Sequence, residues 1–285
     1  MRIVDHALGE TRVPVNPQRI VVLTGSLDTV LALGVKPVGS VEILQENHLE
    51  NEVKGVESIG SPRSPNLEAI VALNPDLILG TDWDKGIYET LSQIAPTVIA
   101  EVDSSGEWKE LLYTYADALG ETDKAEQIMA DYDARIEEFR MQMGDRLQET
   151  EVSIVNIYQG IVQLYLADSF SGTIVADAEL PRPHHQTNTD QKFSMNISKE
   201  LLHMADGDAM FVWIYDINKE VVEDDQATLK ELKADPLWLK LNAVQKDRVY
   251  DVPGSHWIGM GPIAANLVLD DLFEYLVDSP SQSAQ

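Results

Sequence analysis

The sequence predicts an α/β fold of two similar lobes with mainly parallel sheets, joined by one long rigid interdomain helix. In both halves, short apolar runs alternate with amphipathic segments, which is typical of parallel sheets covered by helices on both faces. Residues 66–79 and 197–212 also share one pattern, in which a Glu opens a short helix and an Asp follows eight residues later, just before an apolar strand. Residues 122–147 carry no Gly or Pro before Gly144, so at 1.5 Å per residue we expect one helix on the order of 35 Å long.

The first half predicts an N-terminal α/β lobe over residues 1–120. Asn66 is expected to cap the helix that begins at Leu67. The expected elements, in order, are an edge hairpin at 2–13, strand 20–23, helix 27–33, strand 37–41, loop 57–65, the helix from 67, strand 77–80, loop 81–86, helix 88–94 and strand 97–100.

The connecting helix is assigned to residues 121–149 and a C-terminal α/β lobe to residues 150–285. The expected elements of that lobe are a strand pair at 152–158 and 163–167 about Gly160, helix 172–178, a polar loop at 181–194, the repeated helix and strand, helical pieces at 229–233 and 238–241, strand 249–252, helix 263–277 and a disordered tail at 279–285.

Two further repeats support a chain built from similar halves. Residues 19–26 and 248–255 each suggest a strand running into a Gly-Ser turn, and residues 31–37 and 175–183 each suggest a helix end leading to a strand. We expect a ligand between two such lobes, because ligand pockets concentrate at domain interfaces.

Composition excludes several classes of function. The chain has 285 residues, with 48 Asp and Glu against 21 Lys and Arg and a formal charge of −27, so it lacks the basic face that nucleic acid or anionic lipid requires. It has no Cys, which excludes disulfides, cysteine zinc sites, iron–sulfur clusters and thiol nucleophiles. No run approaches the roughly 20 apolar residues of a membrane span, and no leader pattern opens the chain, so we expect a soluble protein that is cytosolic or has lost an export signal.

Catalysis is not expected. The chain carries no Gly-rich phosphate loop, no nucleophile elbow and no HExxH motif. The adjacent carboxylates Asp224-Asp225 and Asp270-Asp271 would diverge on a helix or strand and could not act on one substrate atom.

Four segments carry a resemblance to a known family: residues 6–11 followed by 17–23, residues 60–76, Asp235-Pro236-Leu237-Trp238, and residues 257–271. Over nearly its whole length the chain resembles the substrate-binding proteins of bacterial iron–siderophore ABC importers, which include the ferric dicitrate and ferric hydroxamate binders. These are periplasmic binding proteins of the helical-backbone class, class III.

The resemblance implies an iron-transport protein in the periplasm or anchored as a lipoprotein on the outer face of a membrane. It implies a monomer that captures a ferric chelate between its lobes, with little hinge motion, and delivers it to an ABC permease dimer. Iron would enter only as part of the chelate, with no permanently bound cofactor. A cobalamin or haem carrier of the same fold remains the alternative, because Trp and Arg suit a corrin or porphyrin equally well. Direct zinc or manganese binding is disfavoured, because the six His form no evident ligand set.

A ferric chelate presents negatively charged oxygens and an organic periphery, so its site needs cationic donors and aromatic faces. The resemblance and the strand-end positions suggest these ligand-binding residues: Arg63, Trp83, Arg182, Trp213, Tyr215, His256, Trp257, Thr24 and Ser26. The alternatives are an exposed or ion-paired role for each Arg, ordinary core packing for the aromatic residues, and local turn capping for Thr24 and Ser26. His256 could donate to a chelate oxygen, enter an open position on the iron, or be a hydrogen-bonded structural side chain.

Glu68 and Glu200 are the repeated glutamates, one in each half. The resemblance implies that they dock onto Arg residues of the permease. The alternative is that each only favours a helix N-terminus, which is worth about 0.3–1 kcal/mol.

Overall fold

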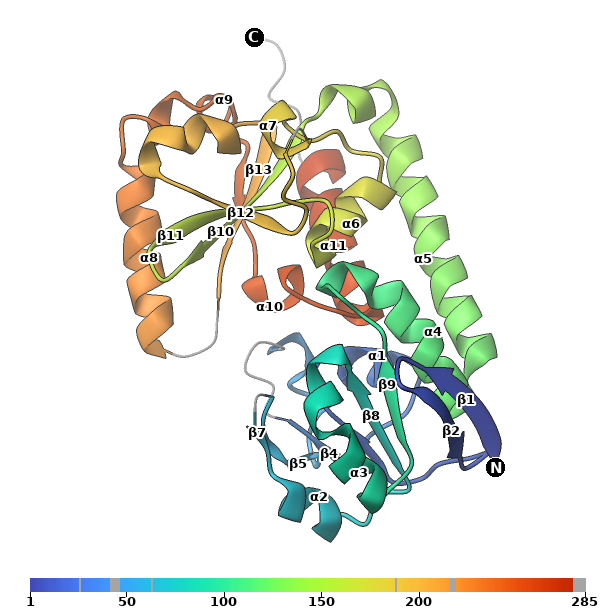
Figure 1. Ribbon diagram of the computed structural model, residues 1–285. Helices are drawn as coiled ribbons and strands as arrows, with labels where there is room; N and C mark the ends of the chain where they lie inside the picture. The colour runs from blue at the N-terminus through green and yellow to red at the C-terminus, as the bar shows by residue number, and fades with distance from the viewer. Residues whose placement is uncertain (26, 42–46, 63, 188, 216–218, 279–285) are drawn as a thin grey trace. The chain divides into compact units, whose positions relative to one another are not determined.

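The computed structural model describes residues 1–25, 27–41, 47–62, 64–187, 189–215 and 219–278 (Figure 1). The chain forms two compact units, Met1–Asp131 with Met260–Ala264, and Tyr132–Gly259 with Ala265–Gln285. The helix α5, Thr122–Met143, carries the chain from the first unit into the second. The predicted α/β fold with mainly parallel sheets and one long helix is therefore confirmed, whereas the division into residues 1–120, 121–149 and 150–285 stays a prediction.

A five-stranded parallel sheet forms the centre of the first unit, in the order β5-β4-β3-β8-β9. Its central strands β3 and β8 are buried along their whole length, as expected where helices cover both faces. Helices α2 and α3 pack on one face, and α1 and α4 lie on the other (Figure 1). The strands are β3 Ile20–Val22, β4 Gly39–Ser40, β5 Glu57–Ser58, β8 Leu77–Thr81 and β9 Thr97–Ala100, and the helices are α1 Leu27–Ala32, α2 Leu67–Ala72, α3 Tyr88–Ile94 and α4 Trp108–Leu119.

The predicted edge hairpin is present as β1, Arg2–His6, and β2, Gly9–Val13. The predicted helix cap is also present, because the Asn66 side chain accepts a hydrogen bond from the Ala69 amide at 3.0 Å. The prediction of a plain loop at 57–65 was wrong. Its first residues form β5, which extends the sheet, and β6, Gly60–Ser61, pairs with β7, Ser64–Pro65. Similarly, the expected loop at 81–86 is the 3₁₀ helix η2, Asp82–Ile87.

The second unit is built on a mixed sheet in the order β12-β11-β10-β13-β14. The predicted strand pair about Gly160 is confirmed as β10, Val152–Tyr158, and β11, Ile161–Tyr165. A strand that sequence reasoning missed, β12 at Ser194–Ile197, pairs antiparallel with β11, so the polar loop ends earlier than expected. The remaining strands, β13 at Ala209–Ile214 and β14 at Val249–Asp251, run parallel to β10.

Several helices of the second unit differ from the sequence-based expectation. The helical piece expected at 229–233 belongs to α8, Lys219–Lys233. The segment after residue 180 leads into a helix, α7, and not into a strand; Gly254-Ser255 opens helix α10 and is not a turn. The expected disordered tail at 279–285 lies outside the described residues. The helices are α6 Phe170–Asp177, α7 His184–Thr187, α8, α9 Asn242–Gln245, α10 Gly254–Trp257 and α11 Pro262–Leu272, with shorter turns at Gly144–Glu149, Lys199–Ala205, Trp238–Lys240 and Phe273–Asp278.

The repeated Asp has a structural explanation in both units. Asp76 precedes β8, and its carboxylate accepts hydrogen bonds from the amides of Gln18 and Arg19, both at 2.8 Å, just before β3. Asp208 precedes β13 and accepts from the Glu151 amide at 3.2 Å, just before β10. In each unit, therefore, the Asp fixes the entry of the parallel strand next to its own.

Candidate functional site

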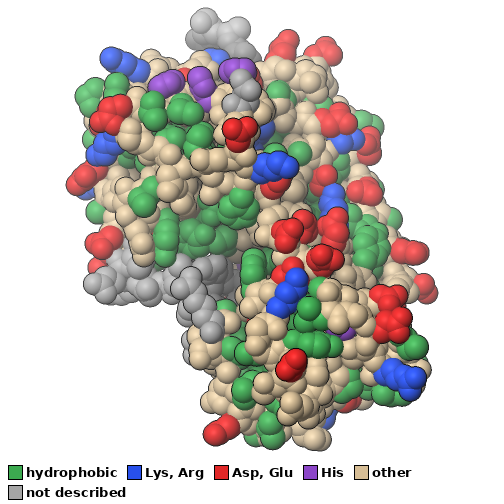
Figure 2. Space-filling model, viewed as in Figure 1, with side chains coloured by type: hydrophobic (Ala, Val, Ile, Leu, Met, Phe, Trp, Pro, Cys, Tyr) green, Lys and Arg blue, Asp and Glu red, His purple; other side chains and the backbone are tan. Residues whose placement is uncertain are grey.

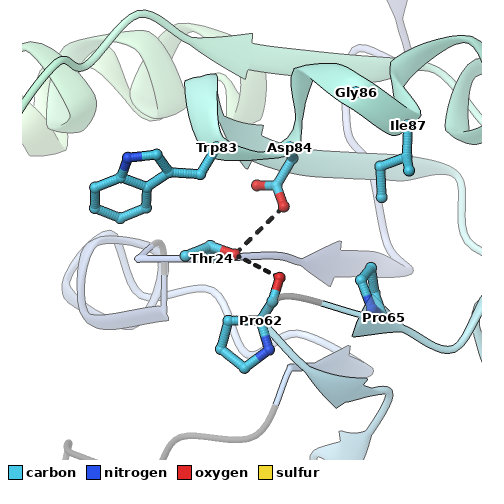
Figure 3. Close-up of a pocket in the computed structure, with 7 residues that line it drawn as sticks. All are labelled: Thr24, Pro62, Pro65, Trp83, Asp84, Gly86 and Ile87. Atoms are coloured by element: carbon cyan, nitrogen blue, oxygen red, sulfur yellow. Dashed lines mark hydrogen bonds between the residues drawn. The ribbon is translucent and has the colours of Figure 1, made fainter.

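A hollow of about 490 Å³ opens on the first unit, near the carboxyl ends of β3 and β8. Ligands of open α/β sheets bind at this edge, and the volume lies within the range of small-molecule pockets. Figure 3 shows Thr24 between Asp84 and Pro62, with Ile87 and Pro65 facing each other farther along. The lining residues are Thr24, Pro62, Pro65, Trp83, Asp84, Gly86 and Ile87.

Two of the predicted ligand-binding residues, Thr24 and Trp83, meet at this hollow. Trp83 lies on η2 and is 55% exposed, which is unusual for so large an apolar ring and is typical of a binding surface. Its ring also approaches the turn at Gly25, which has a φ of +72°. The predicted residues Ser26 and Arg63 lie outside the described residues.

Asp84 is a lining residue that sequence reasoning missed. Its side chain is only 3% exposed and accepts hydrogen bonds from the Thr81 amide at 3.0 Å and the Thr24 hydroxyl at 3.3 Å. Burial raises the pKa of Asp84 to about 6, and the hydrogen bonds from Thr81 and Thr24 only partly oppose this rise. The spacing Thr81-x-x-Asp84, which resembles a helix capping box, is the sequence signal that could have drawn attention to it.

An aromatic cluster gathers on the second unit. The Tyr165 and Tyr215 hydroxyls lie 3.0 Å apart, and the Tyr165 ring centroid lies 5.0 Å from that of Trp213 and 5.6 Å from that of Phe193. The Tyr158 and Tyr215 rings are 4.7 Å apart. Burial raises the pKa values of Tyr165 and Tyr215, so both stay protonated at neutral pH; one hydroxyl donates to the other, and the proton of the accepting hydroxyl is left for another partner. The structure thus brings the predicted residues Trp213 and Tyr215 together, although Trp213 lies within β13 and not after it.

Arg182 adjoins this cluster. One of its terminal nitrogens donates to the Tyr165 carbonyl and, at 2.7 Å, to Gln186 Oε1. Its other two guanidinium nitrogens, Nε and Nη1, are buried and have no hydrogen-bond partner among the described residues. Burial lowers the pKa of Arg182 to about 10, so the side chain remains a cation at neutral pH. Acidic side chains are spread over the face seen in Figure 2, yet none of the described ones pairs with Arg182.

His256 and Trp257 are part of the core of the second unit. Trp257 has no exposed surface, stacks on Phe211 at 4.8 Å between centroids, and donates from Nε1 to Asp271 at 2.7 Å. His256 is 7% exposed and lies 2.8 Å from the same Asp271 oxygen. The ligand-binding roles of His256 and Trp257 stay predictions. In the structure both side chains are buried beside Asp271, which fits the alternative of a structural role.

Glu68 and Glu200 are both exposed at helix starts. The pKa of Glu200 is lowered, chiefly because the Ser198 hydroxyl donates to its carboxylate. This hydrogen bond supports the local role at a helix N-terminus and leaves the docking role a prediction.

The described part of the chain offers neither a metal-binding cluster nor a membrane-spanning helix. No three His, Asp or Glu side chains in that part of the chain are grouped so that they could hold a metal ion. Among the helices that the structure describes, none has the length and apolar character needed to cross a bilayer.

Comparison with known proteins assigns the chain to a family. The family described as "Periplasmic binding protein" matches residues 20–255. The chain belongs to this family. Proteins similar to it include the "Probable siderophore-binding lipoprotein YfiY" of Bacillus subtilis, which is 36% identical over 97% of this chain and 88% of its own length. The achromobactin-binding periplasmic protein of Dickeya dadantii is 29% identical over 90% of this chain and 85% of its own.

Among solved structures, Staphylococcus aureus SirA complexed with staphyloferrin B superposes with a TM-score of 0.87 at 28% identity. The match covers 97% of this chain and 98% of the SirA chain. The resemblance to siderophore-binding proteins, which the sequence suggested, is confirmed by these relatives.

Proposed function

We propose that this periplasmic binding protein captures a ferric chelate of the siderophore, citrate or hydroxamate type and delivers it to an ABC permease. The observation that carries the proposal is Arg182, a cation with two buried N–H-bearing nitrogens that have no partner among the described residues. The named relatives that bind siderophores support the chemical class of the ligand.

The Nε and Nη1 groups of Arg182 carry a free-energy cost as long as they have no hydrogen-bond partner among the described residues. A buried donor without a partner costs about 1–3 kcal/mol, and more when it is charged. An anionic oxygen placed against Nε and Nη1 would remove that cost and would form charge-assisted hydrogen bonds. In a chain with a formal charge of −27, a cation that pairs with none of the described carboxylates is well suited to an anion from outside.

The aromatic residues supply the second half of the recognition. One of the hydroxyls of Tyr165 and Tyr215 donates to the other, so the accepting one keeps a proton that it can donate to a ligand. The neighbouring rings offer faces to the organic part of a chelate. On the first unit, Thr24 and the exposed ring of Trp83 have the same character.

We propose the following ligand contacts: Arg63, Thr24, Ser26 and Trp83 on the first unit, and Arg182, Trp213, Tyr215, His256 and Trp257 on the second. A cleft shared by the two units stays a prediction. The permease is proposed to dock on Glu68 and Glu200.

We further propose that the protein acts outside the cytoplasm as a monomer, in the periplasm or as a lipoprotein, with no nucleic-acid partner. It is proposed to have no enzymatic activity and no resident cofactor. Iron is cargo held by the chelate and needs no ligand from the protein.

The experiment is a binding panel read by quenching of intrinsic Trp fluorescence. The panel contains ferric staphyloferrin B, ferric citrate, a ferric hydroxamate, haem and cobalamin, each titrated into the purified protein. The proposal expects saturable quenching by one or more ferric chelates and none by the same chelators without iron at equal concentration. Binding of haem or cobalamin alone would establish the alternative carrier function. If no ligand of the panel quenched the fluorescence, both proposed functions would be contradicted.

A further inference from the structure

The hydroxyl of Thr24 lies between two acceptors in the hollow of the first unit. Its Oγ1 is 3.3 Å from Asp84 Oδ1 and 3.4 Å from the Pro62 carbonyl oxygen (Figure 3). A hydroxyl carries one proton and can donate only one full hydrogen bond. Both distances exceed the 2.7–2.8 Å that is typical of an O–H···O bond, as expected when one proton is shared between two oxygens.

We propose that Asp84, Thr24 and Pro62 form a proton-dependent clasp that holds the paired strands β6 and β7 at Pro62 when Asp84 is protonated. With a proton from water on Oδ1, Asp84 donates to Thr24 Oγ1, and the Thr24 proton is then available to the Pro62 carbonyl. Asp84 Oδ2 continues to accept from the Thr81 amide. When Asp84 is ionised, its Oδ1 competes for the Thr24 proton, and the bond to Pro62 is weakened.

The surroundings of Asp84 support a proton at this position. A methyl group added at Gly80 would lie 2.9 Å from Asp84 Oδ2 and within 3.2 Å of the Leu23 and Ile99 side chains, so the strands next to Asp84 present apolar groups. On its own helix, Asp82 and Lys85 pair with each other at 2.8 Å. Neither contributes to the shift of the Asp84 pKa, which is raised to about 6 by burial. Between β6 and β7, the charged residue is Arg63, which lies outside the described residues.

The direction of the pH effect follows from the raised pKa. The folded chain binds the Asp84 proton more tightly than the unfolded chain, whose Asp has a pKa near 3.8. The folded state is therefore favoured as pH falls from above 6 toward 3.8, and this contribution is lost as pH rises through about 6. The clasp likewise forms as pH falls through about 6, because Asp84 becomes protonated there.

Pro62, between β6 and β7, and Pro65, at the end of β7, both line the hollow. If the proposed chelate-binding function holds, the clasp keeps Pro62 at the lining when Asp84 is protonated, so the chelate dissociates more slowly in mildly acidic medium. This consequence rests on the proposed function, whereas the clasp itself does not.

The first experiment uses the ligand-free protein, so that it is independent of any chelate. The side-chain carboxyl carbon of Asp84 and the amides of Ser61 and Ser64 are followed by NMR between about pH 4.5 and 7.5. We expect the Asp84 signal to titrate near pH 6, with amide exchange at Ser61 and Ser64, after correction for its intrinsic pH dependence, about 2–10-fold slower on the acidic side.

Two variants separate the clasp from general effects of pH. Asp84→Asn presents an amide that can donate to Thr24 while its carbonyl accepts from Thr81, so we expect slow exchange at the two Ser amides at every pH. Thr24→Val keeps the side-chain shape and removes the hydroxyl, so we expect rapid exchange at these amides while Asp84 still titrates. Asp82→Asn, which changes a neighbouring carboxylate that pairs with Lys85, is the control and should behave as the parent chain.

If amide exchange at Ser61 and Ser64 still follows the titration of Asp84 in Thr24→Val, the clasp is refuted. It is also refuted if exchange at these amides in the parent chain does not respond to that titration.

The second experiment compares dissociation of ferric citrate, or of the chelate that the panel identifies, from the parent chain and from Asp84→Asn. We expect dissociation from the parent to slow about 2–10-fold below pH 6 relative to the variant; an unchanged ratio contradicts the consequence for the ligand. Failure of every chelate to bind would instead refute the proposed function and leave the NMR result valid.

Discussion

The candidate surfaces on the two units differ in what they offer an anionic ligand. The hollow of the first unit presents apolar groups, a hydroxyl and a buried carboxyl, and its described lining includes no cation. The surface of the second unit combines Arg182 with a cluster of aromatic rings. Among the described residues at the two candidate sites, the cation is Arg182 of the second unit, whereas the first unit offers apolar area and the Thr24 hydroxyl. We therefore expect a larger loss of affinity from a substitution at Arg182 than from one at Trp83.

The Trp residues near strand ends also differ between the two units in how much of their surface is exposed. Trp83 keeps 55% of its surface exposed, whereas Trp213 and Trp257 keep 1% and 0%. In the second unit a neighbouring ring lies against each indole: Tyr165 approaches Trp213, and Phe211 stacks on Trp257. A Trp at a strand end thus keeps exposed surface in the ligand-free chain only where no other ring packs over it.

Trp257→Ala should have the largest effect, and the effect should be on stability. The variant removes a fully buried ring and its hydrogen bond to Asp271, so we expect the free energy of unfolding to fall by about 3–5 kcal/mol. Trp257→Phe keeps a ring against Phe211 and should lose about 1–2 kcal/mol. Urea denaturation followed by circular dichroism measures both.

Trp83→Ala is the matched control for Trp257→Ala, because its ring is mostly exposed and should cost less than about 1 kcal/mol. Equal losses at the two positions would remove the distinction between a surface Trp and a core Trp. A stable Trp257→Ala that no longer binds chelate would return Trp257 to the ligand site.

Arg182→Ala should have the next largest effect, on affinity. Loss of charge-assisted hydrogen bonds of about 1.5–3 kcal/mol predicts a 10–100-fold weaker dissociation constant for the ferric chelate. Arg182→Lys keeps the charge but cannot present the planar fork of donors, so we expect only partial recovery. Fluorescence titration gives the constants, and thermal unfolding checks that the variants are folded.

Arg140 is the control for charge alone. It already pairs with Glu137 and Glu179, so Arg140→Ala should leave chelate affinity unchanged although it makes the same change in net charge. If the two Ala variants weakened binding equally, long-range electrostatics and not a contact at Arg182 would explain the loss.

The sequence was a sound guide wherever one physical cause dominates. Buried parallel strands require continuous apolar runs, which located β3, β8 and β13. The long helix α5 followed from a stretch without Gly or Pro, and it ends at Gly144. The repeated Asp was visible as a pattern, although only the structure showed that it binds the amides that precede the neighbouring strand.

The sequence was a poor guide wherever partners distant along the chain decide the outcome. The strand β12 is a short polar segment, and it is a strand because β11 offers it an antiparallel edge. Asp84 gave only a weak capping signal, because its burial depends on the packing of η2 against β8 and β9. Trp257 was expected at a ligand site because the position matched a family pattern, and nothing local revealed Phe211 above it or Asp271 beside it.

Trp83→Ala should have the smallest effect on affinity that is still measurable. A ligand that covers the exposed part of this ring would bury apolar area worth about 1–2 kcal/mol, so we expect a dissociation constant about 5–30-fold weaker. Trp83→Phe should recover most of the loss, because a ring face remains.

Tyr113, which is 46% exposed on α4 and does not line the hollow, provides the matched control, and Tyr113→Ala should bind as the parent does. Calorimetric titration measures all three without depending on the fluorescence that the substitutions alter. If Trp83→Ala weakened binding as much as Arg182→Ala, the two units would contribute equally and the contrast between them would not hold; if it had no effect, the hollow of the first unit would not face the chelate.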